Sequence, residues 1–191
     1  MNQEKIVIKI VGQANSGKTS IFNVFNEGTF QINPISTVGP DFANKEINIS
    51  NHQITLQIWD IHGGENLRNI VKCYYRGSSG FLIVFDITRK ESFEDVKFWI
   101  NSIQETDFPQ PVTIALAGNK SDLKENRQVT KEEAELFAAQ NDIHYFEISA
   151  KNNEGINDVF NYLATQSFNR IFCSKEEPDI KNEARGTCVI C

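Results

Sequence analysis

The sequence predicts an α/β fold built on a mainly parallel sheet. Short apolar runs alternate with amphipathic helical patterns along most of the chain, the order expected when helices cover a parallel sheet. The runs over 80–86 and 112–118 are continuously apolar, as strands buried on both faces are. A glycine-rich segment, "GQANSGKT" over 12–19, joins the first apolar run to a helical pattern.

Six apolar runs are expected to form strands. The run "QITLQIWD" alternates with period two through Ile54, Leu56 and Ile58, which is typical of a strand. The pattern "DFANKEINIS" is the weakest of the six. The expected strands cover residues 5–12, 41–50, 53–60, 80–86, 112–118 and 143–149.

Three helices are predicted between and after these strands. "SFEDVKFWINSI" begins with Ser92 as an N-cap, and "TKEEAELFAAQ" begins with a capping box formed by Thr130 and Glu133. "EGINDVFNYLA" places a third apolar stripe on one helical face. After residue 172 the periodicity stops, so we expect one domain over 1–172 and a disordered tail over 173–191.

Composition and charge exclude several classes of protein. A chain of 191 residues favours a single domain. The net charge of −6 argues against a nucleic-acid binder, which needs a basic face. Four cysteines far apart suggest no disulfide framework, and "CVIC" at the terminus lacks the partners of a zinc or thioredoxin-like site. Because no long apolar run is present, neither a signal peptide nor a membrane span is expected.

The segment "GQANSGKT" matches G-x-x-x-x-G-K-[ST] and predicts a phosphate-binding loop. Its glycines let backbone N–H groups surround phosphates, and the following helix N-terminus adds positive potential. Lys18 is expected to reach the β- and γ-phosphates, and the Thr19 hydroxyl to bind Mg²⁺. The residues expected around the phosphates are Ala14, Asn15, Ser16, Gly17, Lys18, Thr19 and Ser20.

Two further loops indicate that the base is guanine. "GNKSD" follows an apolar strand, at the edge of the sheet where ligands bind. A carboxylate at Asp122 can accept both the N1–H and the exocyclic amine of guanine, a donor pair that adenine lacks; Asn119 is its companion, and the Lys120 stem lies along the base plane. "ISAK" ends the next strand and contributes Ser149, Ala150 and Lys151, with the Ala150 N–H directed at guanine O6.

With these motifs in order, the chain resembles a Ras-superfamily small GTPase, and within it the Rab family. "STVGPDF" over 36–42 is similar to the Rab switch I signature, and "LQIWD", "YYRGSSG" and "FLIVFDIT" are similar to other Rab segments. The resemblance covers residues 5–170. It implies that Thr37 closes on Mg²⁺ and the γ-phosphate, and that Phe30 packs on guanine.

The resemblance implies a P-loop NTPase of the Ras-like G-domain type, with six strands, one of them antiparallel, and five helices. It implies a GTP/GDP switch in which two loops, over 31–43 and 61–77, are ordered by Mg²⁺ and the γ-phosphate. Asp60 would act on the metal through water, and the N–H of Gly63 would sense the γ-phosphate. Lys18, Thr37 and Gly63 would then support hydrolysis.

The segment "DIHGGE" departs from the family pattern D-T-A-G-Q-E. Ile61 replaces threonine, His62 replaces alanine, and Gly64 replaces the glutamine that orients the attacking water. Ala14 lies near the space that an arginine finger enters, and Pro34 replaces a common tyrosine. We therefore expect tight nucleotide binding with slow intrinsic hydrolysis, with His62 as an alternative group to steer the water.

The tail predicts a lipid anchor. "CVIC" fits a prenylation box with Cys188 as acceptor, and the Rab resemblance adds Cys191 as a second acceptor. Counting charges over 173–191, Lys175, Lys181 and Arg185 oppose Glu176, Glu177, Asp179 and Glu183, which gives −1. Because no polybasic patch supports a single lipid, a second lipid on Cys191 or Cys173 is favoured.

The leading hypothesis is a Rab-type GTPase regulating vesicle traffic, and the alternative is an essentially non-hydrolysing GTP-binding membrane scaffold controlled by nucleotide exchange. A P-loop kinase or ATPase is disfavoured by "NKSD". The family implies effectors at the switch loops, an exchange factor, a GTPase-activating protein and a prenyl-binding escort related to GDI. A monomer is expected, on the cytoplasmic face of an endomembrane and in a cytosolic pool, with no nucleic-acid partner.

Overall fold

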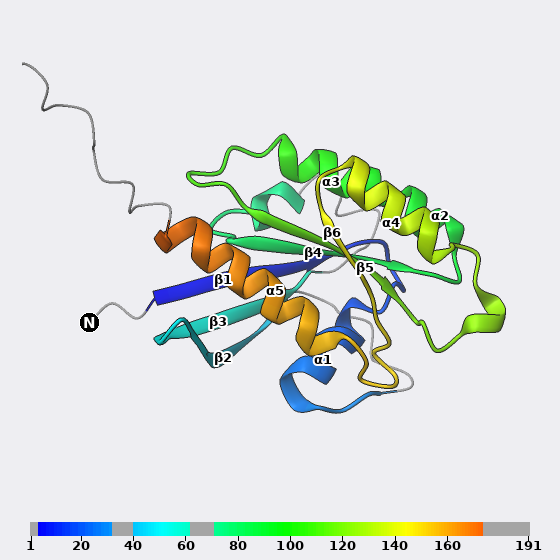
Figure 1. The fold of residues 1–191 in the computed structure, drawn as a ribbon, viewed down its shortest axis with the longest axis horizontal. Coiled ribbons are helices and arrows are strands. Elements are labelled where there is room, and N and C mark those ends of the chain that lie inside the picture. The colour runs from blue at the N-terminus through cyan, green and yellow to red at the C-terminus, as the bar shows by residue number, and fades with distance from the viewer. Residues whose placement is uncertain (1–3, 32–39, 62–70, 174–191) are drawn as a thin grey trace, which may run out of the picture.

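The computed structural model describes residues 4–31, 40–61 and 71–173, and these form one six-stranded sheet covered by helices on both faces (Figure 1). The strand order is β2-β3-β1-β4-β5-β6, with β2 antiparallel to β3 and the other pairs parallel. The strands are β1 Glu4–Val11, β2 Asp41–Ile49, β3 His52–Asp60, β4 Gly80–Asp86, β5 Thr113–Asn119 and β6 His144–Glu147.

The helices form the two outer layers. Helices α1 and α5 pack on one face of the sheet, and α2, α3 and α4 pack on the other (Figure 1). Short 3-10 turns cover Val71–Tyr74 and Lys124–Asn126, and a π-helical turn follows the last helix over Asn169–Cys173. The helices are α1 Lys18–Glu27, α2 Lys90–Glu94, α3 Val96–Gln104, α4 Lys131–Gln140 and α5 Ile156–Phe168.

The period-two pattern of the strands separates two hydrophobic clusters. Ile6, Ile8 and Ile10 of β1 point to the layer of α1 and α5, where every one of them is buried. All seven residues of the central strand β4 are buried, because helices cover both of its faces. The sheet and its six strands therefore agree with the sequence prediction, including the weak strand over 41–50, which forms the antiparallel edge.

The prediction that Ser92 caps a helix is wrong. The helix begins at Lys90 with Arg89 as N-cap, and Ser92 lies inside it. The buried Ser92 hydroxyl instead donates to the Arg89 carbonyl (2.7 Å) and accepts from the Asp86 N–H (3.0 Å), so it fixes the turn after β4. A side chain that bonds a preceding turn is no longer available as a cap.

Two other helical predictions need adjustment. Thr130 does cap α4, accepting from the Glu133 N–H at 3.1 Å, but the Glu133 carboxylate pairs with Lys90, so only half of the capping box forms. Helices α2 and α3 meet at Asp95. If α2 and α3 are counted as one helix, the described part of the chain has four separate helices, whereas the resemblance implies five.

Within the same ranges, no helix is both long and apolar enough to cross a membrane. The strand predicted over 143–149 is shorter than expected, since β6 ends at Glu147. Beyond it, Ser149 forms a two-way backbone bridge with Glu154, which turns the chain toward α5. This early end of the strand leaves the "ISAK" residues in a loop at the carboxyl edge of the sheet.

Candidate functional site

The phosphate loop joins β1 to α1 at the carboxyl edge of the sheet, and its two motif glycines are required by close contacts. At Gly12 (φ 140°) a Cβ would lie 2.1 Å from the Val84 carbonyl oxygen. At Gly17 (φ 93°) a Cβ would lie 2.2 Å from the Asn119 amide nitrogen. Only glycine allows this backbone to pass so close to β4 and to the segment "GNKSD" over 118–122, called the base loop below.

Lys18 is held inside the phosphate loop. Its side chain is buried, and its Nζ donates to the Gln13 carbonyl oxygen at 2.9 Å. Burial lowers the pKa of Lys18 to about 8, while the charge of Asp60 opposes this shift. A pKa of about 8 leaves the ammonium mainly protonated at pH 7, as binding a phosphate requires.

Thr19 and Asp60 bring two oxygen ligands together beside the loop. The Thr19 hydroxyl donates to Asp60 Oδ2 at 2.6 Å, although the two residues are 41 positions apart. Asp60 is buried at the carboxyl end of β3. A hydroxyl and a carboxylate next to a phosphate loop fit the oxygen-rich coordination of Mg²⁺, which keeps several waters and takes the rest from substrate phosphates.

Asn119 connects the base loop to the phosphate loop. Its side chain is 1% exposed, and its amide donates to the Ser16 carbonyl oxygen at 2.9 Å. Its carbonyl oxygen accepts from the Ala150 N–H at 3.1 Å. One buried amide therefore fixes all three sequence motifs relative to one another, and the expected contact of the Ala150 N–H with guanine O6 stays a prediction.

The acidic and basic side chains of the base loop are also fixed by partners. Asp122 Oδ1 accepts from the Ser149 hydroxyl at 2.7 Å, and its other oxygen lies 3.8 Å from Lys151 Nζ. These contacts fix the orientation of the Asp122 carboxylate, and its oxygens can still accept hydrogen bonds from a nucleotide base.

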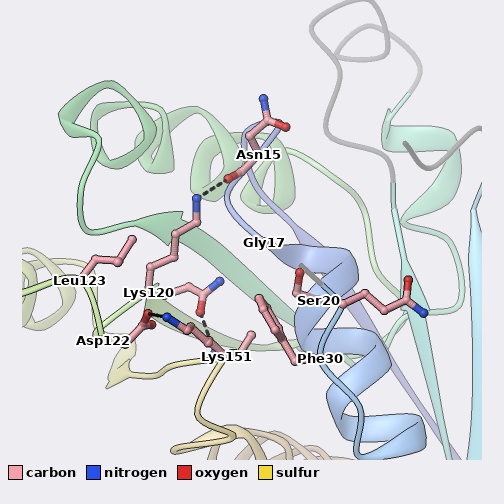
Figure 2. A pocket seen from close by; sticks show the side chains of 11 residues that line it. Asn15, Gly17, Ser20, Phe30, Lys120, Asp122, Leu123 and Lys151 are labelled. Carbon is pink, nitrogen blue, oxygen red and sulfur yellow. Dashed lines mark hydrogen bonds and ion pairs between the residues drawn. The ribbon is translucent and has the colours of Figure 1, made fainter. Parts of the chain in front are cut away.

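Lys120 spans from the base loop to the phosphate loop. Its Nζ donates to the Asn15 carbonyl oxygen at 3.1 Å and pairs with the buried Asp86 carboxylate at 2.6 Å. Figure 2 shows this side chain reaching across to Asn15. The Lys120 stem thus forms one wall of the space between the loops.

These loops enclose a cavity of about 510 Å³ (Figure 2). This volume is in the range of small-molecule sites. Phe30, 38% exposed, and Leu123 supply apolar surface, and Asp122 and Lys151 supply charge. The lining residues are Asn15, Gly17, Ser20, Phe30, Gln31, Asn119, Lys120, Asp122, Leu123, Ala150 and Lys151.

A second polar group lies next to Gly118, near the end of β5. Arg127 forms two hydrogen bonds to the Glu147 carboxylate, at 2.7 and 3.0 Å, and the Tyr145 hydroxyl lies 3.2 Å from the same carboxylate. Burial, followed by the charge of Glu147, raises the pKa of Tyr145. At Gly118 a Cβ would lie 2.5 Å from the Tyr145 oxygen, so the strand end is packed tightly against this group.

The structure brings most of the predicted residues together. The residues expected at the phosphates, the base and the metal surround one edge of the sheet. They are residues 14–20, Phe30, Asp60 and the "NKSD" and "ISAK" loops. The remaining predicted residues lie outside the described ranges; they are Pro34, Thr37, His62, Gly63, Gly64, Cys188 and Cys191.

Sequence reasoning missed five residues of this region: Gln13, Gln31, Asp86, Arg89 and Leu123. Asp86 could have been found, because it ends the buried strand β4 at the ligand-binding edge of the sheet. Leu123 follows the base motif directly. No local pattern marks Gln13 or Arg89, whose contacts join elements 76 positions apart.

Comparisons with known proteins agree with this geometry. Residues 5–169 match the model of the Ras family. The Ras-related protein Rab-11C of Dictyostelium discoideum is 37% identical over 95% of this chain and 80% of its own. Rab-13 of Mesocricetus auratus is 39% identical (81% and 76% covered), and the GTP-binding protein ypt3 of Schizosaccharomyces pombe is 38% identical (83% and 74%). The chain therefore belongs to the Rab family of Ras-like small GTPases.

Proposed function

We propose that this Rab-family protein is a GTP/GDP switch of vesicle traffic whose intrinsic hydrolysis is slow. The main observation behind this proposal is the Asn119 side-chain amide, which hydrogen-bonds both the phosphate loop and the "ISAK" loop. The three predicted nucleotide motifs therefore surround one cavity. Such a connection couples recognition of the base to the placement of the phosphates.

The proposed base specificity follows from the chemistry of Asp122. A carboxylate has only acceptors, so it suits the adjacent N1–H and amine donors of guanine and not the acceptor N1 of adenine. The Asp122 carboxylate accepts from Ser149 and lies near Lys151, and Asp122 and Lys151 both line the cavity. Phe30 and the Lys120 stem are proposed to cover the two faces of the base.

Magnesium is proposed to bind the Thr19 hydroxyl and, through water, Asp60, with Thr37 joining in the GTP state. When bound, the ion neutralises charge on the β- and γ-phosphates. Lys18, buried and cationic, is proposed to hold the same phosphates, and the Gly63 N–H to contact the γ-phosphate. The support for this assignment is the 2.6 Å contact of Thr19 with Asp60 beside Lys18.

Slow hydrolysis is proposed because Gly64 has no side chain to orient the attacking water. The test is single-turnover hydrolysis of preloaded GTP by the full chain and by Gly64→Gln, with Gly64→Ala as control. We expect Gly64→Gln to be faster by at least about tenfold, since positioning and acid–base effects of single groups reach ~10²–10⁴. Equal rates for Gly64→Gln, Gly64→Ala and the unsubstituted chain would refute the proposal.

The second candidate, an essentially non-hydrolysing scaffold, is favoured by the combination of Gly64 with Ala14 in the phosphate loop. The same hydrolysis assay distinguishes the two candidate functions. A measurable rate of hydrolysis supports the slow switch, whereas bound GTP that is exchanged before it is hydrolysed supports the scaffold. A His62→Ala variant tests the remaining side chain, because a rate equal to that of the unsubstituted chain excludes His62 as the group that steers water.

Membrane attachment is proposed through prenylation of Cys188 and Cys191, which belong to the tail over 173–191 and not to the G domain over 1–172. The net charge of −1 on that tail favours two lipids over one lipid with electrostatic help. Intact-mass measurement on protein from its native cells distinguishes two, one and no prenyl groups. The proposed cycle uses effectors, an exchange factor, a GTPase-activating protein and a GDI-like escort, between an endomembrane and the cytosol.

A further inference from the structure

Arg89 lies against the phosphate loop from a distant part of the chain. Its Nη1 donates to the Ala14 carbonyl oxygen at 3.2 Å, and its Nη2 donates to Gln13 Oε1 at 2.8 Å. Gln13 and Ala14 both belong to the loop that is expected to surround the phosphates. The guanidinium is therefore hydrogen-bonded to two successive residues of the phosphate loop.

The backbone of Arg89 is held firmly in this position. Its N–H donates to the Asp86 carbonyl oxygen at 3.0 Å, and its carbonyl oxygen accepts from the Ser92 hydroxyl at 2.7 Å and the Ser92 N–H at 3.1 Å. The same turn is closed by the Thr88 hydroxyl, which donates to Asp86 Oδ1 at 2.7 Å. Because this turn is attached to the buried end of β4, the backbone of Arg89 is fixed there, and its side chain is half-buried.

Arg89 differs from its basic neighbours in what it contacts. Lys90 pairs with Glu133, and Lys120 pairs with Asp86. Among the described residues no carboxylate lies within ion-pair distance of Arg89. Within the described ranges its guanidinium bonds the neutral oxygens of Gln13 and Ala14. An anionic phosphate oxygen is a stronger partner for it, because attraction between opposite charges adds to the hydrogen bond.

Two cations thus converge on one residue of the loop. Lys18 bonds the backbone oxygen of Gln13, and Arg89 bonds its side chain. Lys18 is buried, whereas the Arg89 side chain is half-buried. An arginine at this place has the forked donors that match two oxygens of a phosphoryl group.

We propose that Arg89 is a catalytic cation supplied within the chain, which binds the γ-phosphate oxygens during GTP hydrolysis. In this reaction water adds to the γ-phosphorus, the bond from it to the β–γ bridging oxygen breaks, and the products are GDP and phosphate. Arg89 exchanges its contacts with Gln13 and Ala14 for γ-phosphate oxygens and neither gains nor loses a proton. The inference rests on the proposed GTPase function and assigns a residue that sustains hydrolysis without the side chain missing at Gly64.

The test is single-turnover GTP hydrolysis by the full chain with Arg89→Gln, which keeps a donor amide but removes the charge. Lys90→Gln is the matched control, because it removes the same charge from the neighbouring position. We expect Arg89→Gln to slow hydrolysis at least about tenfold, since a donor to a transition-state oxyanion is worth ~10²–10³ and an arginine finger more. Release of GDP, which lacks the γ-phosphate, should change less than twofold in both variants.

Three results would overturn the proposal: hydrolysis by Arg89→Gln at the unsubstituted rate, an equal loss in Lys90→Gln, or a parallel change of GDP release. The last would show that Arg89 only braces the loop. Repeating Arg89→Gln in the Gly64→Gln background keeps the effect measurable if the basal rate is very low. Failure of Gly64→Gln to accelerate hydrolysis bears on the proposed slow rate, whereas failure of Arg89→Gln to slow it bears on Arg89 alone.

Discussion

Replacing Lys9 with methionine should change how the stability of this protein depends on pH. Lys9 is 7% exposed in the middle of β1, and its Nζ donates to the carbonyl oxygens of Tyr74 and Arg76, the latter at 3.0 Å. The Trp59 ring centroid lies 5.9 Å away. Since no carboxylate among the described residues pairs with it, burial lowers the pKa of Lys9 from 10.5 to about 8.

The sign of the effect follows from the two pKa values. Below pH 8 the folded and unfolded chains both carry the proton, so folding bears the whole cost of burying the charge, about 3 kcal/mol at 1.36 kcal/mol per pKa unit. Between pH 8 and 10.5 the folded chain releases the proton and the unfolded chain keeps it. The free energy of unfolding therefore rises with pH, by about 2 kcal/mol between pH 7 and 9.5 from this group.

The assay is urea unfolding of the GDP-saturated full chain and of Lys9→Met at these two pH values. Lys18, whose pKa is also about 8, is present in both proteins, so its contribution cancels in the difference. Lys5→Met, at an exposed position of the same strand, controls for the loss of one lysine. We expect the unsubstituted chain to gain about 2 kcal/mol relative to Lys9→Met on going to pH 9.5. Parallel pH dependence in the two proteins would refute the argument that Lys9 is buried with its charge uncompensated.

Two further predictions concern the base loop. Asp122→Asn should lower GDP affinity at least about a hundredfold, because two hydrogen bonds to a charged group are lost at ~1.5–3 kcal/mol each. It should raise affinity for the xanthine nucleotide, because the new amide can donate to the second carbonyl of xanthine. Nucleotide competition measures both affinities, and unchanged GDP binding would contradict the assignment. Gly118→Ala should lower the free energy of unfolding by about 1–3 kcal/mol through overpacking against the Tyr145 oxygen at 2.5 Å and Phe85 Cζ at 2.9 Å. Adding Tyr145→Phe should recover part of that loss in the same unfolding assay, and a full loss in the double variant would show that the hydroxyl is not the obstacle.

The sequence alone was sufficient where the signal is contiguous. The phosphate loop, "GNKSD" and "ISAK" are short segments at strand ends, and each can be recognised from its own residues. The period-two and continuous apolar runs likewise predicted all six strands, because burial on one or both sheet faces acts residue by residue. The helix boundary at Ser92 was predicted wrongly, since its hydroxyl bonds the turn after β4 rather than the N-terminus of a helix.

The sequence by itself determined the class of protein. It also predicted residues of a nucleotide site, since both depend on local motifs. The tertiary structure decided which of them act together. The Asn119 amide meets Ser16 across 103 positions, Arg89 meets Gln13 across 76, and Lys9 meets the carbonyl of Arg76 across 67. Such contacts arise only when the register of β1 against β4, and of β4 against β5, sets the loops at one edge side by side, and no spacing along the chain contains that register.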